Sequence, residues 1–173
     1  MSPPRRLRLR VLGELSSDAS AVDALREKLG GRAKESDPSV GALVSVPGHG
    51  PARVGVVLFA DAAEAHVWVG DGLVRRVARS ELSPHDGAVD APRAAIADSA
   101  RLFAGLAEGA LVAFVAADGA PARGRLVEKH RFGALVEVDG KVLAIGFRRF
   151  AQSGAAFATA LPRLRKRACE PVV

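Results

Sequence analysis

The chain has 173 residues, of which 49% are apolar and 25% are charged, the balance of a folded protein with one or two small domains. It has no uninterrupted run of about 18 apolar residues, which excludes a membrane-spanning helix, and its basic start lacks the apolar stretch of a secretory signal. The single cysteine, Cys169, excludes an intramolecular disulfide framework and a cysteine-based metal cluster. We therefore expect a cytoplasmic protein without membrane attachment.

The net charge of +6 is concentrated at the two ends of the chain, and the body between them is close to neutral. The basic side chains of the ends are Arg5, Arg6, Arg8, Arg10, Arg163, Arg165, Lys166 and Arg167. Such ends can hold the phosphates of a nucleic acid even where the folded body binds none. The alternative is that they only increase solubility.

Residues 1–40 are expected to form a basic arm and one short helix. Residues 7–11 alternate apolar and basic side chains, which predicts an edge strand with Arg8 and Arg10 on its outer face. Ser17 and Asp18 fit helix caps, and an apolar helical stripe follows them until two glycines end it: Val22, Leu25 and Leu29.

Two later stretches carry the same landmarks in the same order. The first contains Gly41-Ala42-Leu43-Val44, Pro51-Ala52-Arg53 and Asp71-Gly72, and the second contains Gly109-Ala110-Leu111-Val112, Pro121-Ala122-Arg123 and Asp139-Gly140. The first and last landmarks recur at one common offset, whereas the offset of the middle landmark is longer by two positions, which predicts a short insertion before Pro121 and a compensating deletion after it. We infer an internal duplication.

Short apolar or alternating runs between turn residues predict strands in both copies. In the first copy they cover residues 43–46, 52–59, 65–69 and 73–78, and in the second 111–115, 123–129, 134–138 and 141–147. Each Asp-Gly pair supplies the positive φ angles of a tight hairpin turn. The fold class is therefore mainly β.

A meander of about 42 residues buries a core best by curling into a partly closed barrel. In length and strand rhythm, residues 41–82 and 109–150 resemble the small SH3-like barrels of the Tudor and KOW type. The resemblance implies two tandem SH3-like barrels and a binding module. Members of these groups bind peptides, methylated side chains, nucleic acids or RNA polymerase, so the partner stays open.

The expected organisation has five parts: arm and helix (1–40), first barrel (41–84), helical connector (85–108), second barrel (109–150), and a short helix with a basic tail (151–173). The connector is expected to be helical because Pro92 fits a first turn and apolar residues recur at helical spacing: Ile96, Ala100, Phe103 and Ala107. Residues 155–161 are expected to form the last helix.

No catalytic residue, metal site or cofactor is expected. The histidines (His49, His66, His85 and His130) are widely spaced, and no acid/base pair or nucleophile constellation follows from the spacing, so we expect no enzyme. Alignment on the Asp-Gly pairs places Trp68 opposite Val136, which predicts a core position. Because the chain has no tyrosine and its one tryptophan is expected in the core, we expect neither an aromatic cage nor a set of base-stacking platforms.

The second copy is the more basic one, and its candidate phosphate-binding residues are Arg123, Arg125, Lys129, Arg131, Arg148 and Arg149. Joined to the basic ends, they would form a stripe that positions the protein on nucleic acid without reading bases. In the first copy Arg75 and Arg79 align with Leu143 and Phe147. Either the alignment is shifted there or the copies bury different faces.

Two functions remain. The first is a non-enzymatic, nucleic-acid-associated module, linked to transcription, with phosphates held by the basic ends and the second barrel. The alternative is a protein–protein interaction adaptor that uses barrel grooves or strand edges.

Overall fold

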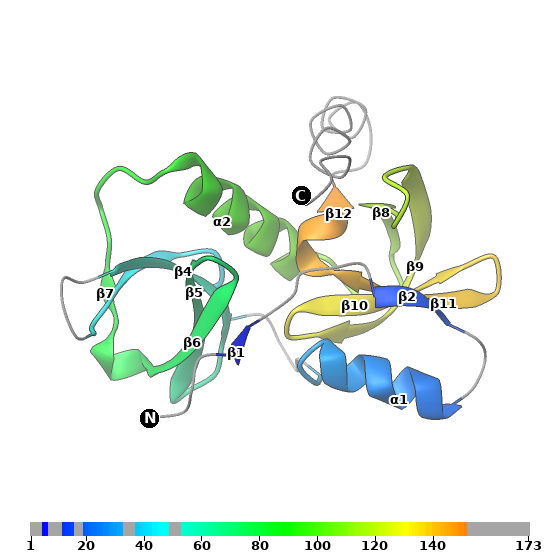
Figure 1. Ribbon diagram of the computed structural model, residues 1–173, viewed down its shortest axis with the longest axis horizontal. Coiled ribbons are helices and arrows are strands. Elements are labelled where there is room, and N and C mark those ends of the chain that lie inside the picture. The colour runs from blue at the N-terminus through cyan, green and yellow to red at the C-terminus, as the bar shows by residue number, and fades with distance from the viewer. Residues whose placement is uncertain (1–4, 7–11, 16–18, 33–36, 49–52, 152–173) are drawn as a thin grey trace, which may run out of the picture. The chain divides into compact units, whose positions relative to one another are not determined.

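The structure, a computed structural model, describes residues 5–6, 12–15, 19–32, 37–48 and 53–151. It is mainly β, with two antiparallel sheets and two α-helices (Figure 1). Contacts divide the chain into two units, and the segment expected as one N-terminal region contributes to both. Neither helix of the described residues is long and apolar enough to cross a membrane.

The first unit contains the strands β1 (Arg5–Arg6), β3 (Leu43–Val46), β4 (Arg53–Ala60), β5 (Glu64–Gly70), β6 (Leu73–Ala78) and β7 (Ser83–Pro84). A 3₁₀ turn, η1 (Arg79–Glu81), links β6 to β7, and the helix α2 (Ala91–Ala104) follows. The strands are ordered β1-β6-β5-β4-β3-β7. The inner face of this sheet buries Val44, Val46, Val57, Ala60, Ala65, Val67, Val69 and Val77.

The second unit contains β2 (Leu12–Leu15), β8 (Leu111–Val115), β9 (Pro121–His130), β10 (Gly133–Val138), β11 (Lys141–Gly146) and β12 (Phe150–Ala151). The 3₁₀ turn η2 (Phe147–Arg149) links β11 to β12, and the strands are ordered β12-β8-β9-β10-β11-β2. The helix α1 (Ala19–Lys28) also belongs to this unit. Its Leu25 packs with the following Leu29 against Leu135 and Ala144, as the apolar stripe predicts.

The two units share one topology. In each, four antiparallel strands lead through a 3₁₀ turn into a short strand that pairs with the first of the four. The sheets are open, with β1 and β7 at the edges of the first and β2 and β12 at the edges of the second. The mainly β fold is thus confirmed, whereas barrel closure is not observed.

The eight strands expected in the two copies all form, with bounds that differ only slightly from the expected ones. Asp71 and Asp139 both adopt a φ of 50°, and each is followed by a glycine of positive φ. These are the turn conformations that an Asp-Gly pair favours. The edge strand expected over residues 7–11 and the helix expected over residues 155–161 lie outside the described residues.

The strand registers correct the alignment of the two copies. Val46 pairs with Arg53, and Phe114, which stands at the common offset from Val46, pairs with Ala122. Arg53 is therefore equivalent to Ala122, and not to Arg123 as the Pro-Ala-Arg landmark predicts. Two residues are equivalent when they hold the same place in the strand-pairing registers of the two units. The extra residue of β5, between Trp68 and Gly70, restores the common offset at the Asp-Gly turn.

Arg75 and Arg79 are correctly aligned with Leu143 and Phe147. Arg75 pairs with Val67, and Leu143 pairs with the equivalent Val136. The chemistry differs instead. Arg75 donates from Nη1 to the Pro47 carbonyl at 3.1 Å. Arg79 binds a carboxylate oxygen of Asp37 at 2.7 Å, where the second unit has a buried phenylalanine.

Candidate interaction surface on the second sheet

The candidate phosphate-binding residues of β9 fall into two groups. Arg123 and Arg125 are exposed on one side of the strand, and Val127 continues the same alternation. The structure gives neither arginine an ion-pair partner among the residues that it describes. Lys129 is different, because its Nζ donates to the Leu106 carbonyl at 2.9 Å. Burial lowers the pKa of Lys129.

No described contact joins the remaining candidate residues of the second unit, Arg131, Arg148 and Arg149, to Arg123 and Arg125 in a continuous stripe. Arg149 donates to the Ala116 carbonyl at 3.3 Å, and burial lowers its pKa. Arg148 is exposed beside it on η2. Arg131 lies in the turn after β9, where its backbone N–H donates to the Gly31 carbonyl at 3.0 Å. Lys129 and Arg149 thus have structural roles.

The basic residues of the two ends can be placed only in part. Arg5 and Arg6 form β1, which pairs with Leu73 and Val74 at the edge of the first sheet. The remaining ones lie outside the described residues: Arg8, Arg10, Arg163, Arg165, Lys166 and Arg167.

A row of cross-strand neighbours on the outer face of each sheet distinguishes the two units. In the first, paired residues run across β3, β4, β5 and β6: Leu43, Val56, Trp68 and Val74. In the second, the equivalent row runs across β8, β9, β10 and β11: Leu111, Arg125, Glu137 and Val142. Two buried apolar residues in the middle of the first row are thus replaced by two exposed, oppositely charged ones.

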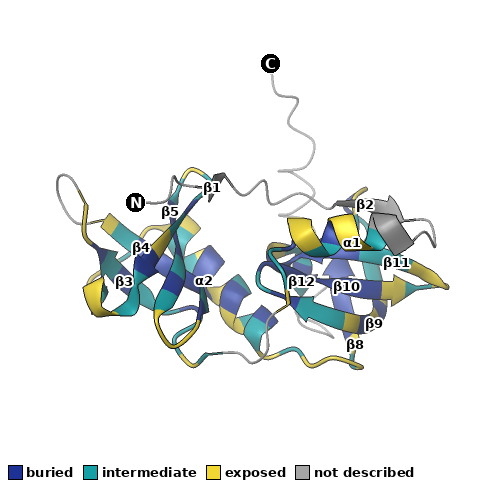
Figure 2. Ribbon diagram, turned by 90° about the horizontal axis from the view of Figure 1, so that it is seen from below, coloured by how far each residue is buried: buried dark blue, intermediate teal, exposed yellow. Residues whose placement is uncertain are grey.

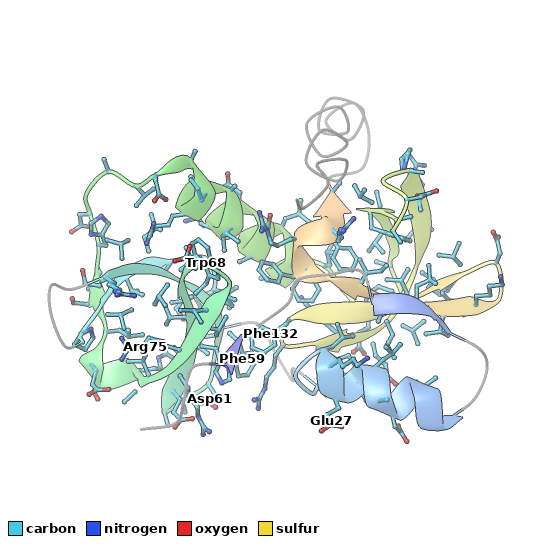
Figure 3. All side chains as sticks on the ribbon, viewed as in Figure 1. Glu27, Phe59, Asp61, Trp68, Arg75 and Phe132 are labelled. Atoms are coloured by element: carbon cyan, nitrogen blue, oxygen red, sulfur yellow. The ribbon has the colours of Figure 1, made fainter. Side chains whose placement is uncertain are left out.

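Helix α2 accounts for the apolar row of the first unit. The helix packs on β4, and its Arg93 guanidinium lies 5.7 Å from the centre of the Trp68 ring. Trp68 lies on the side of the sheet that faces α2 (Figure 3). The same guanidinium donates from Nε to the Val54 carbonyl at 2.8 Å and from Nη2 to the Val69 carbonyl at 3.5 Å. Trp68 is therefore buried, as expected, but on the outer face and opposite Glu137 rather than Val136.

In the described part of the second unit, no helix covers the equivalent part of the outer face. Leu111 is 72% exposed and Val127 is 40% exposed, and no other large apolar side chain of the described residues is as exposed. Figure 2 shows exposed positions alternating with buried ones along β9. An apolar side chain in water loses the free energy of burial, so adjacent exposed ones mark an interaction site more strongly than scattered ones do. We call Leu111, Arg123, Arg125, Val127 and Glu137 the open face.

The other end of the second sheet is covered by α1 and contains a polar cluster around one buried histidine. His130 is 2% exposed, and its Nε2 lies 3.1 Å from an oxygen of Glu128. Glu128 also accepts from two nitrogens of Arg26 on α1, at 2.8 and 2.7 Å. The hydrogen bond from Arg26 is the main cause that lowers the pKa of Glu128. Since Arg26 lies on α1 and Glu128 lies on β9, these hydrogen bonds fasten α1 to β9.

Sequence reasoning found the two arginines of the open face but missed Leu111, Val127 and Glu137. The available signal was the replacement of Val56 and Trp68 by charged residues, which the shift of one position in the alignment concealed. No protein-family model matches the chain, and no curated protein matches it. Among the described residues, no group of three His, Cys, Asp or Glu side chains is placed to hold a metal ion.

Proposed function

We propose that the chain is a non-enzymatic adaptor made of two SH3-like units, and that the open face of its second unit binds a protein partner. The architecture supports the SH3-like assignment, because in each unit a 3₁₀ turn leads into a last short strand that pairs with the first. The observation that carries the proposal is the pair of equivalent rows, one covered by a helix and the other open.

The composition of the open face supports a protein partner. Its exposed leucine and valine lie beside two arginines, and arginine is enriched in protein interfaces because its planar head forms several hydrogen bonds at once. A phosphate backbone would use the arginines but would leave Leu111 in water.

The test is affinity capture with the purified chain as bait, quantified for the original sequence and for Leu111→Asp. Ala62→Asp is the matched control, since it adds the same charge at an exposed position of the first unit. We expect at least one protein to be captured by the original chain and by Ala62→Asp but not by Leu111→Asp. The same protein should bind the original chain when both are purified. Equal capture by all three baits would overturn the proposal.

Nucleic-acid binding is the second candidate, favoured by the exposure of Arg123 and Arg125 and by the basic ends. Its test is the affinity for duplex DNA and structured RNA across a salt series. If both arginines contact phosphates, Arg123→Gln/Arg125→Gln lowers the slope of log K against log salt for duplex DNA by about 0.9 for each contact. A slope unchanged by the double substitution removes the open face from this function.

A further inference from the structure

In the first unit, helix α2 covers the outer face of the sheet. We propose that the open face of the second unit binds an amphipathic α-helix of a partner protein, with apolar side chains toward the sheet and acidic side chains toward Arg123 and Arg125. This inference rests on the proposed adaptor function and specifies its partner.

The position of the open face within the sheet favours a helix over a strand. β9 is paired on both sides, by β8 and β10, and β8 is paired with β9 along its length and with β12 at Ala113 and Phe114. A strand gains affinity by pairing with a free sheet edge, whereas four of the five residues of the open face lie on β9 and β10, which are paired on both sides. A helix satisfies its own backbone hydrogen bonds and presents only side chains, so it can bind the flat of a sheet.

Helix α2 shows which side chains suit such a face. Its buried residues are Ile96, Ala97, Ala100 and Phe103, spaced so that they line one side of the helix (Figure 2). Two of the four are alanines, which allow the helix backbone to approach closely. The carbonyl of Ala97 would lie only 3.0 Å from a Cβ placed on Gly41, just before β3. A ligand helix for the open face needs a similar stripe to cover Leu111 and Val127.

The charges of the open face define the polar part of the ligand. Arg125 replaces Val56, and Glu137 replaces the tryptophan beneath Arg93. A basic side chain at the place of Arg93 would therefore meet Glu137. The two arginines exceed the one glutamate in charge, so the ligand helix as a whole has to be acidic to complement them. Helix α2 itself does not satisfy this condition, because Arg93 and Arg101 offset Asp98 and the N-cap Asp90.

The experiment compares two capped, labelled peptides with the sequence of residues 88–106. One has the original sequence, and the other carries Ser99→Glu and Arg101→Glu and keeps Arg93 for Glu137. We expect the acidic peptide to bind the full chain at least about tenfold more tightly, a difference of about 1.4 kcal/mol. Backbone amide shifts in NMR spectra should then concentrate on β8 and β9.

Variants of the chain separate the open face from general charge effects. Leu111→Asp and Arg125→Glu should each weaken the acidic peptide about tenfold or more. Arg53→Glu is the matched control, because Arg53 is exposed on the first sheet and carries the same charge, and it should leave the affinity unchanged. The amide spectrum of each variant reports whether the second unit is folded. No binding of the acidic peptide at about 1 mM, or binding that all three variants weaken equally, overturns the proposal.

The chain's own C-terminal segment is the competing occupant, and a spin label on Cys169 tests it in the full chain. Broadening of β8 and β9 amides by the label before any peptide is added would show that this segment covers the face, which overturns the partner helix. The adaptor function fails separately, by the capture experiment. A captured protein that depends on Leu111 but does not compete with the acidic peptide leaves the adaptor standing and excludes the helix.

Discussion

At the scale of single residues, two equivalent glycines lie where neighbouring strands approach closely. Gly55 pairs with Val44, and the equivalent Gly124 pairs with Val112, which holds the place of Val44 in the second copy. A Cβ on Gly124 would lie 2.6 Å from the carbonyl oxygen of Glu137, and real Cβ atoms do not approach backbone so closely. Because glycine has no side chain, the backbones of the neighbouring strands can come this close in both sheets.

We therefore predict that Gly124→Ala lowers the free energy of unfolding of the second unit by about 2 kcal/mol, because the backbone has to shift to admit the methyl group. Urea unfolding followed by amide NMR signals of β9 and β10 measures the change. Gly48→Ala is the control, since the nearest neighbour of a Cβ there is a side-chain nitrogen of Arg75 at 3.4 Å. An equal effect of the two substitutions would contradict the argument.

The carboxylate of Glu128 makes the stability of the second unit depend on pH. Its hydrogen bonds with Arg26 hold its pKa below the ordinary 4.5 in the folded state. The stability it contributes is therefore fully present above pH 4.5 and is lost as the pH falls through the lower, folded-state pKa. Glu128→Gln should cost about 1–3 kcal/mol at neutral pH, because His130 and Arg26 lose a charged acceptor.

The difference in free energy between Glu128→Gln and the original chain should shrink as the pH falls below 4.5, as measured by urea unfolding at several pH values. Glu137→Gln provides the comparison, since it removes an exposed carboxylate from the neighbouring strand and should change stability by no more than about 0.5 kcal/mol. A Glu128→Gln cost that stays constant down to about pH 2 would exclude this carboxylate as the cause.

At the scale of elements, the long strands and both described helices were predictable but their coverage was not. Alternation and the Asp-Gly turns place the four long strands of each copy, because these signals are local, but they do not place the short β1, β2, β7 and β12. Which face of a sheet a helix covers depends on contacts that are distant in sequence. In sequence, the short apolar run Val56–Phe59 fits either a buried strand or a core helix. The structure shows a strand, buried on both faces over residues 55–58 because α2 packs on it.

The same limit explains the fate of the candidate site. A basic side chain on a strand looks alike in sequence whether it is exposed, as Arg125 is, or half-buried on a carbonyl, as Lys129 is. Exposure of Leu111 follows only from the absence of a covering helix over that part of the described second unit. The composition of the open face therefore became visible only through the comparison of the two registers.

Helix α2 should depend on Arg93 for its position on the first sheet. Arg93→Ala removes two hydrogen bonds to carbonyl groups and the contact with the Trp68 ring, which together should cost about 1–3 kcal/mol. Trp68 is the chain's single tryptophan, so its fluorescence reports on this contact alone. We expect red-shifted emission and faster iodide quenching. Arg53→Ala should change neither, and unchanged emission in Arg93→Ala would exclude the arginine as the anchor.

At the scale of the whole molecule, one strand topology is covered in two ways. In the second unit, helix α1 lies between β2 and β8 in the chain and packs on Leu135 and Ala144 at one end of the outer face of the sheet. The positions in the first unit equivalent to these two are His66 and Arg76, a cross-strand pair that is not part of an apolar cluster. Each unit thus has one polar and one apolar part of its outer face, in exchanged places. Equivalent positions of the two units therefore require different side chains.

Separate coverage also predicts separate effects on stability. Leu25→Ala on α1 removes a buried side chain from the core of the second unit and should cost that unit about 2–5 kcal/mol. The fluorescence of Trp68 follows unfolding of the first unit, and amide signals of β10 and β11 follow the second. We expect the amide transition to move to lower urea by more than the tryptophan transition does. Lys28→Ala, an exposed change on the same helix, should move neither, and equal shifts in both transitions after Leu25→Ala would mean that the two units unfold as one.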